Sequence, residues 1–96
     1  MSLQKLLKVV GNNIKLFRLR GELSQEKLAK KAGISRSTVQ SAEAGKSIEF
    51  EHILKIAEAL GIHPADLFLT DEDRQITYKA KLFWEALMEY KSNKGD

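Results

Sequence analysis

The sequence predicts an all-α protein, and three observations favour this class. Apolar residues recur at steps of three and four along most of the chain, which is the period of helices that bury one face. Alternation of apolar and polar residues, the pattern of a half-buried strand, never continues for more than a few positions. Proline, which breaks helices, occurs once in 96 residues, at Pro64. The chain length corresponds to one small domain.

The composition limits the class of protein and the cellular compartment that we expect. With 43% hydrophobic and 30% charged residues, the chain is typical of ordinary globular proteins. It has no cysteine, which excludes disulfides and thiolate metal sites and favours the cytoplasm. Its apolar runs are far shorter than the ~20 residues of a membrane span, and its N-terminus lacks the long apolar segment of a signal peptide.

Charge is distributed unevenly along the chain. Residues 12–46 hold eight basic and three acidic side chains, a formal charge of +5, whereas residues 47–73 carry a charge of −6. This asymmetry predicts one face for a polyanion and another face kept away from it.

An apolar stripe predicts a first helix that ends near Arg20, where Gly21 favours termination. Residues 11–13, with the sequence Gly-Asn-Asn, predict a weak point at which this helix bends or restarts. The stripe consists of Leu3, Leu6, Leu7, Val10, Ile14 and Phe17.

Two short helices follow. Ser24 is a suitable N-cap for a helix over about 25–32, and Ser35 for a helix over about 35–44. Gly33 between them supplies the left-handed conformation that a tight turn requires.

A fourth helix is predicted over about 49–60, closed by Gly61. Pro64 then suits the first position of a short fifth helix whose Leu67 and Phe68 face the core. The apolar face of the fourth helix consists of Phe50, Ile53, Leu54, Ile56, Ala57 and Leu60.

The acidic run at residues 71–73 favours the start of a last helix over about 72–91, followed by a frayed tail from Ser92. Its apolar stripe either packs on the chain's own core or pairs with a second copy, and we favour a homodimer. The stripe consists of Ile76, Ala80, Phe83, Trp84, Leu87 and Tyr90.

The third helix has too few apolar residues for a core helix, since only Val39 and Ala42 face inward. Helices of about eight residues do not persist alone, so other helices must hold this one. Its opposite side is short and polar, which suits the B-DNA major groove of roughly 12 Å width.

The run LSQEKLAKKAGISRSTVQSAEAGKS, continued by FEHILKIAEALGIHPADLF, resembles the helix-turn-helix family of lambdoid phage repressors and Cro. The resemblance covers about residues 10–69. It implies a five-helix, phage-repressor-like DNA-binding domain over 1–69, with the helix-turn-helix at about 25–44. Residues 70–96 lie outside the resemblance, and the added C-terminal helix in this segment is predicted from the spacing of its apolar residues. The matching positions are Gln25, Ala29, Gly33, Val39, Glu43, Gly45 and Lys46.

The resemblance also assigns roles. Arginine can grip guanine and glutamine can grip adenine through two hydrogen bonds each. The implied base contacts are Arg36, Ser37, Gln40 and Ser41. The implied phosphate contacts are Ser24, Gln25, Thr38, Lys46 and Ser47. The implied structural clamp is an ion pair between Arg18 and Glu43.

We therefore expect a transcriptional regulator that binds double-stranded DNA, with a repressor favoured and with no cofactor or small-molecule ligand. An antitoxin with autoregulatory DNA binding and a protein-interaction adaptor remain alternatives, and a restriction-modification controller has a similar pattern. The spacing of His52 and His63 does not suit a metal site. Motifs of nucleophilic catalysis are also missing from the sequence, so we do not expect an enzyme.

Overall fold

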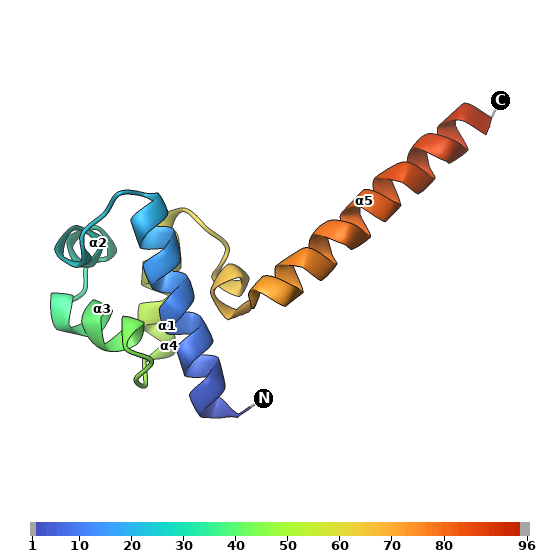
Figure 1. The fold of residues 1–96 in the computed structure, drawn as a ribbon. Coiled ribbons are helices and arrows are strands. Elements are labelled where there is room, and N and C mark those ends of the chain that lie inside the picture. The colour runs from blue at the N-terminus through green and yellow to red at the C-terminus, as the bar shows by residue number, and fades with distance from the viewer. Residues whose placement is uncertain (1, 95–96) are drawn as a thin grey trace.

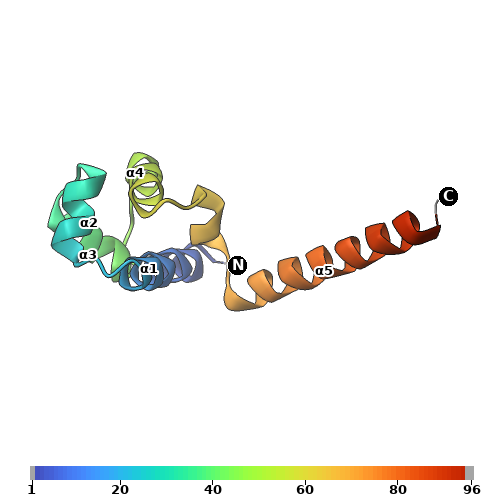
Figure 2. The ribbon, with the colours of Figure 1, turned by 90° about the horizontal axis from the view of Figure 1, so that it is seen from above.

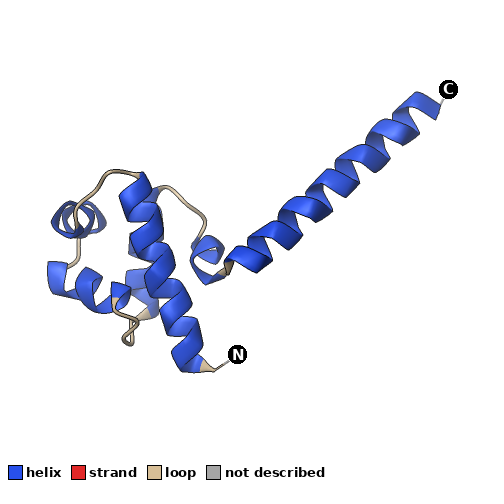
Figure 3. Ribbon diagram, viewed as in Figure 1, coloured by secondary structure: helices blue, strands red, loops and turns tan. Residues whose placement is uncertain are grey.

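The computed structural model describes the backbone of residues 2–94 and the exposure of side chains 2–92. Four α-helices and a 3-10 helix form a bundle, and a long helix leaves it (Figure 1). The elements are α1 (Leu3–Arg20), α2 (Gln25–Ala32), α3 (Arg36–Glu43), α4 (Phe50–Leu60), the 3-10 helix η1 (Pro64–Phe68) and α5 (Asp71–Lys94). Every regular element in the described residues is helical (Figure 3), which confirms the all-α prediction.

One hydrophobic core unites the elements from α1 to η1. Ile14, Leu28, Val39, Ile56 and Leu67 are fully buried, and they come from these five elements in turn. Because each short helix contributes to the same core, tertiary packing stabilises helices that are too short to persist alone.

The apolar faces predicted for the first and fourth helices include residues that are exposed in the structure. Leu3 is 69% exposed, Phe50 is 67% exposed, and Leu54 is also exposed. Within the stripe of α1, Val10 and Ile14 are fully buried and Phe17 is partly buried. Periodicity identifies the face of a helix, but the neighbouring helices decide how far along that face burial extends.

The predicted weak point in α1 is wrong, because the helix is continuous through residues 11–13. A Cβ atom on Gly11 would lie 2.4 Å from the carbonyl oxygen of Ala42 and 3.0 Å from that of Glu43. Gly11 therefore permits close contact between the backbones of α1 and α3.

The turns also differ in one detail from the prediction. Gly33 ends α2 in the left-handed conformation (φ 70°), as expected for the tight turn before α3. At the end of α1, however, Gly21 has a φ of −84° and the left-handed residue is Glu22, with a φ of 57°.

Helix α5 leaves the bundle on the side opposite α2 and α3, as two perpendicular views agree (Figures 1 and 2). The helix continues to Lys94, so the fraying predicted from Ser92 is wrong for residues 92–94. Residues 95–96 lie outside the described part of the chain. From Gln75 to Ser92 its side chains are exposed, apart from a half-buried Met88. The interpretation in which its apolar stripe packs on the chain's own core is therefore wrong.

None of the helices between residues 2 and 94 combines the length and the apolar character that crossing a bilayer demands.

Candidate nucleic-acid interface

Helix α3 is held by one narrow edge. Val39 and Ala42 are buried in the core, on the side that packs against α1 and α2. The Ser35 hydroxyl accepts a hydrogen bond from the Thr38 backbone N–H at 3.1 Å and so caps the first turn. A cap of this kind stabilises a helix by about 1 kcal/mol, which is a large contribution to the stability of a helix of only eight residues.

The C-terminal end of α3 is fixed by a buried ion pair with α1. Arg18 Nε donates to Glu43 Oε2 at 2.6 Å, and Arg18 Nη2 donates to Glu43 Oε1 at 3.0 Å. The side chains are only 10% and 5% exposed, respectively. Arg18 Nη1 also donates to the carbonyl oxygen of Leu23, at 2.9 Å. The structure thus brings together the two residues of the expected clamp.

The four residues assigned to base contacts lie on one helix but differ in accessibility. Arg36, Ser37 and Gln40 are exposed, whereas Ser41 is half-buried. The Ser37 hydroxyl lies 3.0 Å from the hydroxyl of Ser35, within hydrogen-bonding distance. The arginine and the glutamine are therefore the long polar side chains that this face presents outward.

The residues assigned to phosphate contacts gather around the C-terminal end of α3, with the exception of Thr38. Gln25, in the first turn of α2, donates through Nε2 to Glu43 Oε1 at 3.2 Å, which places the start of α2 beside the end of α3. Lys46 and Ser47 are exposed in the segment that follows. Ser24 is exposed as well, and its hydroxyl accepts from the Lys27 backbone N–H at 3.1 Å as the N-cap of α2.

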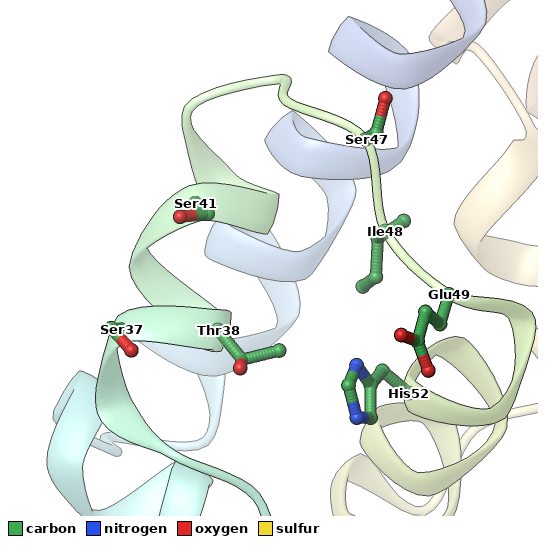
Figure 4. Close-up of a pocket in the computed structure, with 7 residues that line it drawn as sticks. All are labelled: Ser37, Thr38, Ser41, Ser47, Ile48, Glu49 and His52. Carbon is green, nitrogen blue, oxygen red and sulfur yellow. The ribbon is translucent and has the colours of Figure 1, made fainter.

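A cleft of about 260 Å³ lies between α3 and the segment that leads into α4 (Figure 4). Thr38 is half-buried here, and its hydroxyl lies 2.7 Å from that of Ser35. Ile48 packs against the hydrophobic core and anchors the segment before α4. The lining residues are Ser37, Thr38, Ser41, Ser47, Ile48, Glu49 and His52.

Sequence reasoning considered His52 only as a metal ligand and missed its place in this cleft. Its imidazole points from α4 into the space opposite Thr38 (Figure 4). The sequence offered only a weak signal for this, namely a polar residue three positions after Glu49, and hence on the same side of the helix.

Comparison with known proteins identifies this arrangement. The profile of the family described as Helix-turn-helix matches residues 14–67, which span α2, α3 and most of the core. The chain belongs to the helix-turn-helix family. This confirms the resemblance to phage repressors and Cro that the sequence suggested.

Three relatives illustrate how far the likeness extends. An uncharacterized HTH-type transcriptional regulator of Methanocaldococcus jannaschii is 38% identical over 63 residues, 65% of this chain and 96% of the relative. The crystal structure of NHTF, a hypothetical transcription factor from Neisseria, is 33% identical and superposes with a TM-score of 0.72 over 80% of this chain and 90% of that one. The restriction-modification controller C.AhdI from Aeromonas hydrophila is 40% identical, with a TM-score of 0.62 over 65% of this chain and 96% of the controller.

These findings place this helix-turn-helix protein among the DNA-binding transcription regulators and not among the enzymes.

Proposed function

We propose that the chain is a sequence-specific repressor that acts as a homodimer on a palindrome-like operator, with α3 in the major groove of each half-site. The observation that carries this proposal is the asymmetry of α3. Val39 and Ala42 are buried and Glu43 is ion-paired, while Arg36 and Gln40 extend outward. A rigid helix with long polar side chains on its free face is what reading base edges requires.

In this proposal, Arg36 and Gln40 supply the discriminating hydrogen bonds to bases, and Ser37 and Ser41 make shorter contacts beside them. Contacts with DNA phosphates on either side of these bases fix the position of the protein on the duplex and do not read its sequence. The phosphate contacts are Ser24, Gln25, Thr38, Lys46 and Ser47. The N-terminal end of α2 suits a phosphate because its backbone N–H groups carry partial positive charge.

Dimerisation is assigned to the stripe on α5. Ile76 is 66% exposed, Phe83 is 72% exposed and Trp84 is 59% exposed. Large contiguous apolar surfaces of this kind usually mark a partner, and the spacing of the stripe suits pairing of two helices. A twofold dimer would present its recognition helices about one DNA turn, ~34 Å, apart. We place this DNA-bound role in the cytoplasm and assign no small-molecule ligand.

A second candidate is a controller of restriction-modification genes. The 40% identity to C.AhdI, over nearly the whole of that protein, supports it. About a third of this chain has no counterpart in C.AhdI.

Selection of bound duplexes from a random pool, followed by sedimentation of the complex, tests the proposal. We expect recovered sequences with inverted half-sites and two chains per duplex. Arg36→Ala should recover a less specific set. Recovery of no common sequence would overturn the proposal and favour the alternative function as a protein-interaction adaptor. Purification of the chain bound to a small basic protein would favour the alternative function as an antitoxin.

A further inference from the structure

A buried amide lies where α5 leaves the bundle. Asn13 of α1 is 6% exposed, and its Nδ2 donates to the carbonyl oxygens of Leu67 and Leu69, both at 2.8 Å. Its Oδ1 accepts a hydrogen bond from Arg74 Nη2 at 3.0 Å. The amide thus joins three parts of the chain: α1, the segment around η1, and α5.

Arg74 is the α5 residue at the centre of this junction. Its Nη2 also donates to the carbonyl oxygen of Asp66 at 3.0 Å, and its Nη1 donates to Asp71 at 3.2 Å. The guanidinium lies over the ring of Phe17, 5.4 Å from the centroid. A planar group with several fixed donors restrains direction as well as distance.

The start of α5 is restrained a second time. The Thr70 backbone N–H donates to Asp73 Oδ2 at 3.0 Å, and the Asp73 backbone N–H donates to Thr70 Oγ1 at 3.1 Å. These two bonds form a capping box that fixes how the chain enters the helix.

Beyond this first turn, the structure gives α5 little support from the bundle. Side chains from Gln75 to Ser92 are exposed except for the half-buried Met88. The Thr77 hydroxyl donates to the carbonyl oxygen of Asp73, within the helix itself. The direction of the whole helix relative to the bundle is therefore decided near Arg74.

We infer that the contact of Asn13 with Arg74 fixes the angle between α5 and the recognition helix α3, and thereby sets the half-site separation that the dimer accepts. This inference rests on the proposed dimerisation through α5. A helix of 24 residues is ~36 Å long at ~1.5 Å per residue. A rotation of ~10° at its base displaces its end by ~6 Å, close to two base-pair steps of ~3.4 Å.

Arg74→Met tests the inference, because it retains the aliphatic stem and removes every donor. Lys81→Met is the matched control, since it removes one positive charge from an exposed position on the same helix. The probe is an inverted repeat of the half-site recovered from random duplexes, with the spacer varied in steps of one base pair.

We expect the wild type and Lys81→Met to lose about ten-fold in affinity when the spacer changes by two base pairs. For Arg74→Met the loss should shrink to about three-fold or less, while binding to a single half-site persists. An unchanged spacer preference in Arg74→Met would overturn the inference. Should Arg74→Met unfold, Arg74→Lys, which keeps the charge but not the planar fork, carries the same test.

A second measurement is independent of DNA. The chain has no cysteine, so spin labels on Glu26→Cys in α2 and Glu85→Cys in α5 report one distance in full-length protein diluted with unlabelled chain. The distance distribution should be narrow in the wild type and broad in Arg74→Met. A broad wild-type distribution would overturn the inference while leaving dimeric DNA binding intact. A monomeric wild type that binds DNA would instead overturn the proposed dimer and the spacing role together.

Discussion

Arg18 and Glu43, which are 25 residues apart in the sequence, form two hydrogen bonds of 2.6 and 3.0 Å in a nearly buried ion pair. Glu43 also accepts from Gln25, and Arg18 also donates to Leu23. Glu43, the last residue of α3, is therefore tied both to α1 and to the start of α2. This network holds α3 at a fixed orientation while its outer face remains free for another molecule.

Removing one partner of this pair should destabilise the whole domain. Glu43→Ala would leave the Arg18 guanidinium buried without its carboxylate, which costs about 3 kcal/mol. Urea denaturation followed by circular dichroism measures the loss. Glu51→Ala is the control, because the pair of Glu51 with Lys55 lies on the surface and is largely exposed. Equal denaturation midpoints for the two variants would contradict the prediction.

Gly11→Ala should destabilise the protein although alanine favours helices. The added Cβ would lie 2.4 Å from the Ala42 carbonyl oxygen, so α1 and α3 must separate. Overpacking of this kind costs about 1–3 kcal/mol. Asn12→Ala, at an exposed position of the same helix, should be neutral or stabilising by helix propensity. Thermal unfolding distinguishes the two, and an increase in Tm for Gly11→Ala would rule out the close contact.

Arg36→Ala should weaken binding to the selected site more than binding to random DNA, by about 1–3 kcal/mol of discrimination. The reason is that a base contact contributes only where the correct base is present. Lys46→Ala is the comparison, since loss of a phosphate contact weakens both kinds of binding and reduces the salt dependence. Fluorescence anisotropy at two salt concentrations measures both effects. An equal loss on both duplexes would make Arg36 a phosphate contact.

Leu87→Ala should shift the protein from dimer to monomer, because it truncates an apolar side chain on the α5 stripe. Tyr78→Ala removes a larger side chain that is 62% exposed but lies off the stripe, and it should leave the dimer intact. Sedimentation velocity gives the mass of each variant. An unchanged mass for Leu87→Ala would remove the stripe from the interface.

The capping box of α5 should weaken in acid. The hydrogen bonds from the Thr70 backbone and side chain lower the pKa of Asp73 from its ordinary value of 3.8. Because the folded pKa lies below the unfolded one, the cap contributes fully above the ordinary value and is lost as pH falls through the lower folded pKa. An NMR titration of the Asp73 carboxyl carbon measures this pKa, while Asp73→Asn should abolish the associated pH-dependent change at the Thr70 amide. A midpoint at or above 3.8 would contradict the prediction.

The sequence by itself determined that the regular elements are helical and where the helix-turn-helix lies. Ser24 and Ser35 marked helix starts and Gly33 marked the turn, because capping and left-handed backbone depend on local chemistry. The scarcity of apolar residues in α3 likewise predicted that only Val39 and Ala42 of this helix are buried.

Tertiary structure decided what depends on distant residues. Gly11 looked like a weak point until α3 proved to lie against it. Asn13 and Arg74 gave no periodic or motif signal, because their partners lie up to 61 residues away and include backbone carbonyls. The sequence could not give the direction of α5, since local propensity specifies a helix but not where that helix points.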